Sequence, residues 1–232
     1  TINIGTMISE GNISLNSLDN SGEITSNKKL TTTTLENRSG AKISTGEGIQ
    51  NNGTRNLGEI NTNDNFVISG NLENYSVMNI GGLLGTNNLL NTGSLKAVDK
   101  IYTSGVSFNN SGEILTTLLD INNTGILNTN KITVIDNARL NGNNITNNGY
   151  ISGTNIEIIT AGLTNTGTLA ADELIKVNNT TINNTGYIGS NSKVNLSGSN
   201  FTNSGTVESS EIELYNMSGY SNTNLIRGGN VS

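Results

Sequence analysis

The chain has 232 residues and a net charge of -6, and it contains 44 Asn and 28 Gly but no His, Cys, Pro or Trp. The missing His and Cys exclude Ser-His-Asp and Cys-His catalytic centres, zinc fingers and disulfide frameworks, and the acidic balance argues against nucleic-acid binding. Leu, Ile, Val and Phe still make up about 26% of the chain, above the ~20% that separates a chain able to build a core from a disordered one.

A motif of the form apolar-x-Asn-x-Gly-x-apolar repeats along the whole chain. Residues 163–169, 182–188 and 201–207 are its clearest copies, and they follow one another at intervals of 19 residues. Copies at a mean spacing of about 18 residues begin, in chain order, at Thr1, Leu18, Leu35, Thr54, Leu72, Leu89, Phe108, Ile126, Ile145, Leu163, Ile182, Phe201 and Tyr220. Self-similarity at a fixed period predicts a solenoid.

Two columns of the motif carry most of its signal. The Asn column has no exception, and it consists of Asn3, Asn20, Asn37, Asn56, Asn74, Asn91, Asn110, Asn128, Asn147, Asn165, Asn184, Asn203 and Asn222. The column two residues later is mostly glycine, with Gly5, Gly22, Gly58, Gly93, Gly112, Gly149, Gly167, Gly186 and Gly205. Its exceptions are Ser39, Ser76, Asn130 and Asn224.

Two copies of the motif need a choice of register. The copy that begins at Ile121 also fits, but the one that begins at Ile126 gives more even spacings and is preferred. In the copy at Leu35, Gly40 and Ile43 come late, which predicts one extra residue and a small bulge.

Between motifs lies a second apolar pair with a spacing of two residues, for example Ile156 and Ile158 or Ile175 and Val177. This spacing is the period of a β-strand. Each repeat is therefore predicted to hold at least two short strands. The fold class that follows is all-β, a right-handed parallel β-helix of about 13 coils with 17–19 residues each. Residues 1–232 are expected to form a single β-helix segment.

This fold accounts for the unusual composition. A proline would remove a hydrogen bond from an interior strand, and the chain has none. The Asn column is predicted to form a ladder in which each side-chain amide bonds the next along the stack. The Gly column is predicted to supply a positive φ at a tight corner, where Asn is the best substitute.

The repeat of the form L/I-x-N-x-G-x-I/V, with its short apolar pair, resembles the β-helical repeats of filamentous-haemagglutinin-like proteins. That group includes two-partner-secreted exoproteins and the passenger regions of autotransporter adhesins. The resemblance covers the whole chain, and the bias toward Asn, Ile and Thr is similar to that of large fusobacterial-type autotransporters. The motif starts at Thr1, without an initiator Met, a signal peptide or a polar capping unit, so we expect a segment cut from a longer rod.

What the resemblance implies is a structural rod segment of a secreted or surface-displayed bacterial adhesin, which holds a binding region away from the cell. The expected location is extracellular, on the bacterial surface, with anchoring through an outer-membrane barrel that has no counterpart in this sequence. The expected partners are a host-cell or bacterial surface protein or glycan, bound by regions outside this segment, and adjoining coils of the same chain. We expect no enzymatic activity, cofactor, metal or nucleic acid. The alternatives are the stalk of a secreted toxin or contact-dependent inhibition protein and, less favoured, a carbohydrate-active β-helix.

Candidate binding residues are few. Tyr150 and Tyr187 share an outward column two coils apart, about 10 Å in a regular stack. Exposed tyrosines bind sugars or proteins, although covering the sheet is the simpler role. The carboxylates of Asp64, Asp99, Asp136 and Asp172 fall at different places in their coils, unlike the converging acids of β-helical lyases and glycosidases.

Two further groups of polar residues favour a simple surface role. Glu211 and Glu213 share a strand face and are interpreted as solvated. A calcium site at Asp172 and Glu173 lacks the glycine-rich repeat of calcium-binding rolls. The threonine run at residues 31–34 is confined to one coil, which disfavours an ice-binding array.

Overall fold

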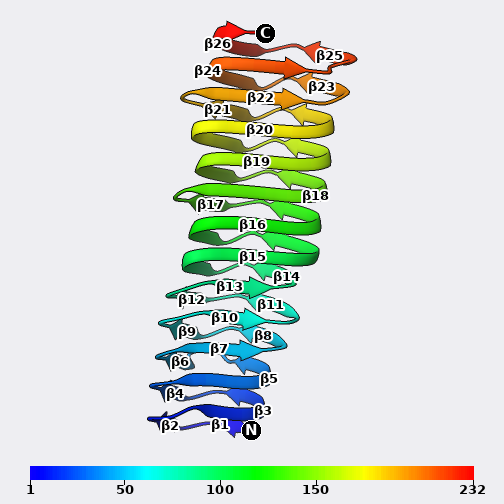
Figure 1. Ribbon diagram of the computed structural model, residues 1–232. Coiled ribbons are helices and arrows are strands. Elements are labelled where there is room, and N and C mark those ends of the chain that lie inside the picture. The colour runs from blue at the N-terminus through cyan, green and yellow to red at the C-terminus, as the bar shows by residue number, and fades with distance from the viewer. The chain divides into compact units, whose positions relative to one another are not determined.

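The computed structural model describes residues 1–232, apart from the side chains of Asn179 and Thr180. Over the described residues it contains strands and no helix. It confirms the predicted all-β, right-handed parallel β-solenoid of about 13 turns (Figure 1). The chain divides into two compact units, Thr1–Thr116 and Thr117–Ser232. We call them the N-terminal unit and the C-terminal unit, and each is described by itself.

Most strands of the N-terminal unit are short, β15 (Ser94–Asn110) being the long one, and β16 (Glu113–Asn128) contains the boundary between the units. Its other strands are β1 (Ile2–Asn3), β2 (Thr6–Ser9), β3 (Ile13–Asn20), β4 (Glu23–Ser26), β5 (Lys29–Asn37), β6 (Lys42–Thr45), β7 (Gly48–Asn51), β8 (Gly53–Asn56), β9 (Glu59–Thr62), β10 (Phe66–Ile68), β11 (Asn71–Asn74), β12 (Val77–Ile80), β13 (Leu84–Thr86), β14 (Asn88–Asn91) and β15 (Ser94–Asn110).

In the C-terminal unit several strands bend around corners and are therefore long. They are the second part of β16, then β17 (Lys131–Val134), β18 (Asn137–Asn147), β19 (Tyr150–Asn165), β20 (Thr168–Asn184), β21 (Tyr187–Ser190), β22 (Lys193–Ser197), β23 (Asn200–Asn203), β24 (Thr206–Tyr215), β25 (Gly219–Asn222) and β26 (Leu225–Val231).

Each coil has three strand segments, one more than the minimum of two that the sequence predicts. The first face is the segment that ends at a ladder asparagine, as in β23. The second face begins three residues after that asparagine, as in β21, and the third face follows it, as in β22. All the pairings within each unit are parallel, and equivalent residues of successive coils lie opposite each other, as Asn165 does to Asn184.

The core of each unit consists of apolar columns that run along the three faces. Side chains alternate between inside and outside along every segment, as the strand period requires. Buried positions include Leu163 and Ile182 on the first face, Ile188 on the second and the pair Ile175 and Val177 on the third, all at most 1% exposed. Each such side chain contributes about 1.5–3 kcal/mol of transfer free energy, and the parallel hydrogen bonds fix the spacing of the coils.

The coil at Leu35 differs from the predicted bulge. Asn37 lies opposite Asn20, but Lys42 lies opposite Glu23, so this corner holds two extra residues rather than one. They form a β-turn in which the Ala41 amide donates to the Arg38 carbonyl at 3.0 Å. Gly40 has a φ of 77°, as the third position of a type II turn requires. Ala41 therefore stands where other coils have glycine, and Ser39 belongs to the insertion.

Candidate functional site

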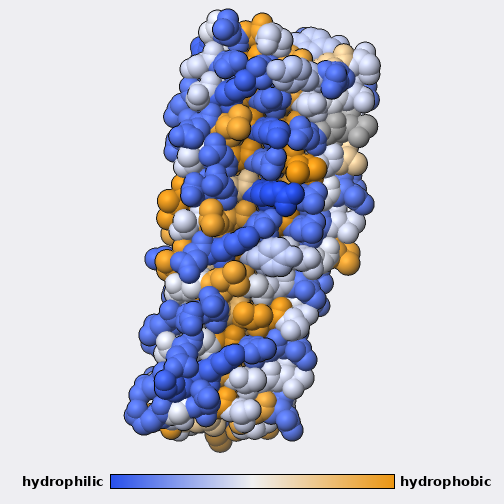
Figure 2. Space-filling view, in the orientation of Figure 1, coloured by the Kyte–Doolittle hydropathy of each residue, from blue (hydrophilic) through white to orange (hydrophobic). Residues whose placement is uncertain are grey.

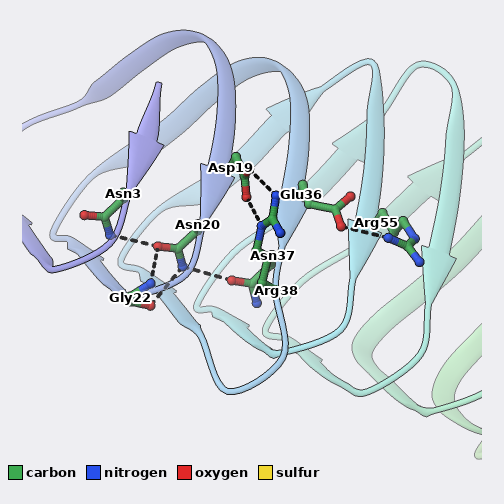
Figure 3. A network of polar contacts seen from close by, with 8 residues as sticks. All are labelled: Asn3, Asp19, Asn20, Gly22, Glu36, Asn37, Arg38 and Arg55. Carbon is green, nitrogen blue, oxygen red and sulfur yellow. Dashed lines mark hydrogen bonds and ion pairs between the residues drawn. The ribbon is translucent and has the colours of Figure 1, made fainter.

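The most regular polar structure of the N-terminal unit is the ladder of buried asparagines on its first face (Figure 3). The side-chain amide of Asn3 donates to the Asn20 oxygen at 2.8 Å, and Asn20 donates to Asn37 at 2.9 Å. The same bond continues through Asn56, Asn74, Asn91 and Asn110 at 2.8–2.9 Å. Asn20, Asn37 and Asn56 are 0% exposed, so the amides are fully withdrawn from solvent.

The C-terminal unit has an equivalent ladder, with bonds of 2.7–2.8 Å that join Asn128, Asn147, Asn165, Asn184, Asn203 and Asn222. Each side-chain amide also lies within hydrogen-bond distance of backbone carbonyls. The Nδ2 of Asn165 also lies 3.3 Å from the Gly167 carbonyl of its own coil and 3.0 Å from the Tyr187 carbonyl of the next coil. Because a buried amide must have partners for both its donors and its acceptor, a carboxylate or an apolar residue cannot replace it without loss.

The predicted reason for the glycine column is wrong. Among the described residues, Gly40 and Asn216 are the ones with a positive φ, and neither belongs to this column. The column is instead a place of close approach between coils. A Cβ built on Gly22 would lie 2.0 Å from the Gly5 carbonyl oxygen, and one on Gly167 would lie 2.0 Å from the Gly149 carbonyl oxygen. Glycine is needed there because the backbone of the coil below occupies the space of a side chain.

Ser76 shows the effect of a side chain in this column. Where Gly93 follows in the next coil, the backbone bond just after it, from the Ser94 amide to the Ser76 carbonyl, is 2.8 Å long. The corresponding bond beside Ser76, from the Val77 amide to the Gly58 carbonyl, is 3.4 Å long. The contact with the coil below is therefore looser after Ser76 than after Gly93.

The outward side of the first face carries a charged column in the N-terminal unit. Arg38 makes a two-pronged ion pair with Asp19 at 2.5 and 2.6 Å. In the same column as Asp19, Arg55 lies 2.8 Å from Glu36 in the coil below and 3.6 Å from Glu73 in the coil above. The hydrogen bond and charge of Arg38 lower the pKa of the Asp19 carboxyl below its ordinary value. These charges are paired across coils, so they follow the stacking register.

In the C-terminal unit the charged column lies on the third face instead. Arg139 lies 3.7 Å from Asp120 and 3.6 Å from Glu157 in the coils on either side. Lys176 in the following coil lies 3.2 Å from Glu157, so the signs alternate over four coils. Figure 2 views strands such as β18, β20 and β22 from outside and shows hydrophilic side chains over much of this face.

Tyr150 and Tyr187 lie on the second face of the C-terminal unit, in one outward column with Thr168 between them. A hollow of about 380 Å³ lies beside both rings. Its floor consists of small residues, among them Gly153, Ala170 and Gly189. The predicted common column of the two tyrosines is therefore confirmed, and the hollow beside them was not predicted. A search for a column of small outward residues next to them would have found it.

The two tyrosines differ in environment. Tyr150 is 40% exposed, whereas the ring of Tyr187 lies over Gly189. A Cβ built on Gly189 would come within 2.4 Å of three atoms of that ring. Desolvation first, and then the nearby Glu208 carboxylate, raise the pKa of the Tyr187 hydroxyl. This hydroxyl is therefore a neutral hydrogen-bonding group at neutral pH.

The acidic residues discussed as alternatives have ordinary surface partners. Lys193 lies 3.2 Å from Glu211 and 2.7 Å from Glu213, and its hydrogen bond lowers the pKa of the Glu213 carboxyl. Within the described part of the chain, no group of three or more acidic side chains forms a metal site. No helix among the described residues is long and apolar enough to cross a membrane.

Comparison of the chain with protein-family models, with curated proteins and with solved structures returns no match.

Proposed function

We propose that this chain is a structural, non-enzymatic segment of a secreted or surface-displayed bacterial adhesin, and that it holds a binding region away from the cell. The observation that carries the proposal is the asparagine ladder. In each unit, every coil bonds the next through the same buried amide contact at 2.7–2.9 Å. A chain that repeats one stacking contact in this way is suited to carry a load along its axis.

The exterior of each unit supports the same proposal. Ion pairs join neighbouring coils rather than residues of one coil, as Arg55 does with Glu36 and Glu73. Exposed pairs of this kind contribute little each, about 0–1 kcal/mol, but they all act in the direction of stacking. The resemblance to filamentous-haemagglutinin-like repeats gives the proposal its biological setting, including outer-membrane anchoring through a region outside this chain.

The proposal is tested in cells that carry the parent gene. An antibody against residues 1–232 should label intact cells, and in-frame removal of these residues should lower adherence while export continues. Labelling that appears only after lysis, or adherence that does not change, would contradict the proposal. Inhibition of neighbouring cells by the parent protein would favour the toxin stalk instead.

A separate assay addresses the enzymatic alternative. The purified chain should release no product from a panel of acidic and neutral polysaccharides. Measurable hydrolysis or elimination would favour a carbohydrate-active β-helix over a structural segment.

A further inference from the structure

The hollow beside Tyr150 and Tyr187 has the features of a ligand site rather than of a plain sheet surface. Its volume of about 380 Å³ lies in the range of small-molecule sites, roughly 300–1,000 Å³. It extends over several coils of the second face, because residues of β17, β19, β20 and β21 line it. A second hollow of about 420 Å³ lies against the same tyrosine, and it shares Tyr187, Ser190 and Asn191 with the first.

We propose that this hollow binds a short neutral saccharide, with Tyr187 and Tyr150 as its aromatic contacts. The proposal goes beyond the structural role, because it gives the segment a ligand of its own.

The aromatic groups of the hollow suit a sugar. The face of a tyrosine ring is electron-rich and packs against the C–H face of a sugar ring, while its hydroxyl end stays polar. Tyr150 and Tyr187 are two coils apart, about 10 Å in a parallel stack. Two contacts at that distance fit a ligand with more than one ring.

The polar groups of the hollow also suit a sugar. Ser152 and Asn191 line it and offer a hydroxyl and an amide group that both donate and accept, whereas the Ser190 hydroxyl is already bonded to the Glu173 carbonyl and the Ser192 amide. Asp172 is the one charged residue in its lining. A carboxylate accepts hydrogen bonds from hydroxyl groups, and it repels an anionic ligand. The lining therefore favours a neutral saccharide over a uronic or sialic acid.

The small residues of the floor make room for the ligand. Tyr187 lies flat because position 189 is glycine, and any side chain there would meet the ring. Ala170 lies opposite Gly189 in the coil below, so the space beside the column of Tyr150, Thr168 and Tyr187 stays open. A longer side chain at position 170 would fill it.

The N-terminal unit lacks this arrangement on its own second face, over the residues that the structure describes. The column that holds the tyrosines in the C-terminal unit is occupied there by Glu23, Lys42 and Glu59, and by Val77 after them. The hollow is therefore a local departure from the repeat and not a consequence of stacking.

Titration calorimetry on the purified 232-residue chain tests the proposal. The probes are neutral tetrasaccharides of β1,4-linked glucose, N-acetylglucosamine and mannose, with a tetragalacturonate as the anionic probe. At least one neutral probe should bind more tightly than tetragalacturonate. Tyr187→Ala should weaken that binding about tenfold or more, which corresponds to about 1.4 kcal/mol. Ala170→Gln, which fills the hollow and keeps both rings, should weaken it to a similar extent.

The matched control is Tyr102→Ala, which removes a tyrosine from the N-terminal unit whose exposure (38%) is close to that of Tyr150 (40%), and it should leave binding within twofold. Thermal melting of each variant separates loss of binding from loss of folding, and Ala170→Gln serves as the decisive variant if Tyr187→Ala unfolds. The proposal is overturned if none of the neutral probes binds, if tetragalacturonate binds best, or if Ala170→Gln and Tyr102→Ala bind equally well.

Discussion

The two units have the same interior and different exteriors. Both have a buried asparagine ladder on the first face, with bonds of 2.7–2.9 Å. Outside, the N-terminal unit has a charged column on the first face, around Arg55, whereas the C-terminal unit has one on the third face, around Arg139. Stacking therefore determines which residue stands at the inward positions, whereas the residues at the outward positions can change from one unit to the other.

The reason for this difference is the cost of burial. An inward amide loses its water and must find each of its partners in the protein, so one residue type fits at every coil. An outward side chain keeps its water, and the choice of residue changes stability little. Substitutions at matched positions in the two units test this distinction.

The largest effect is expected at the ladder. Asn56→Asp in the N-terminal unit and Asn184→Asp in the C-terminal unit should each lower the free energy of unfolding by about 3–5 kcal/mol, because a buried charge loses its partners. Urea denaturation at pH 7 measures the change, with the exposed Asn191→Asp as the control. Both losses should shrink at acid pH, since burial raises the pKa of the new carboxyl and its neutral form donates a hydrogen bond. Equal effects of Asn184→Asp and Asn191→Asp would contradict the distinction.

A smaller effect is expected at the glycine column. Gly22→Ala and Gly167→Ala each place a methyl group 2.0 Å from a carbonyl oxygen of the coil below. The added methyl group should force the two coils apart and lower the free energy of unfolding by about 1–3 kcal/mol in either unit. Gly53→Ala is the control, because its Cβ would meet its nearest atom at 3.8 Å. A control that destabilises as much as the column variants would show that loss of glycine itself, and not close approach, is responsible.

Charge reversal on the exterior should matter less. Arg139→Glu places three acidic residues in a row on the third face, and Arg55→Glu places four in a row on the first face, from Asp19 to Glu73. Each substitution should lower the free energy of unfolding by up to about 1 kcal/mol at low salt. The loss should become smaller at high salt, because salt screens the repulsion. Thermal melting at two salt concentrations measures it. A cost that is independent of salt would indicate a packing role for the arginines.

The smallest effect is a pH dependence from the exposed ion pairs. The folded pKa of Asp19 is lowered by Arg38, and that of Glu213 by Lys193. Their stabilisation is therefore complete above the ordinary carboxyl pKa of about 4 and is lost as the pH falls through the lower folded pKa. Melting temperatures between pH 6 and pH 3 should fall slightly less in Asp19→Asn and Glu213→Gln than in the unmodified chain. A steeper fall of the melting temperature in the variants than in the unmodified chain would contradict a stabilising role of these ion pairs.

The sequence alone predicts the fold class because stacking leaves a signal in every coil. The asparagine at each copy and the strand period of pairs such as Ile156 and Ile158 need no knowledge of distant contacts. The sequence predicts at least two strand segments in each coil and does not identify the third, because the outward residues of a short strand follow no fixed pattern. The cause of the glycine column was also missed, since close approach between Gly22 and Gly5 becomes visible only when two coils are placed together.

The candidate site could be predicted only in part. The column of Tyr150 and Tyr187 follows from the period, but the hollow depends on Ala170 and Gly189, and small residues have many other causes. The corner after Asn37 is predicted to have one extra residue and has two. The prediction is wrong because Ala41, and not Gly40, stands at the position that is glycine in other coils.

The asparagine ladder also gives each unit a polarity. Every amide donates toward the coil that follows and accepts from the coil that precedes, so the dipoles of the ladder point one way and reinforce one another. A coil turned end for end would set donor against donor on the side of the following coil and oxygen against oxygen on the side of the preceding coil. The ladder is therefore directional: it can be extended by another coil in one orientation and not in the reverse orientation.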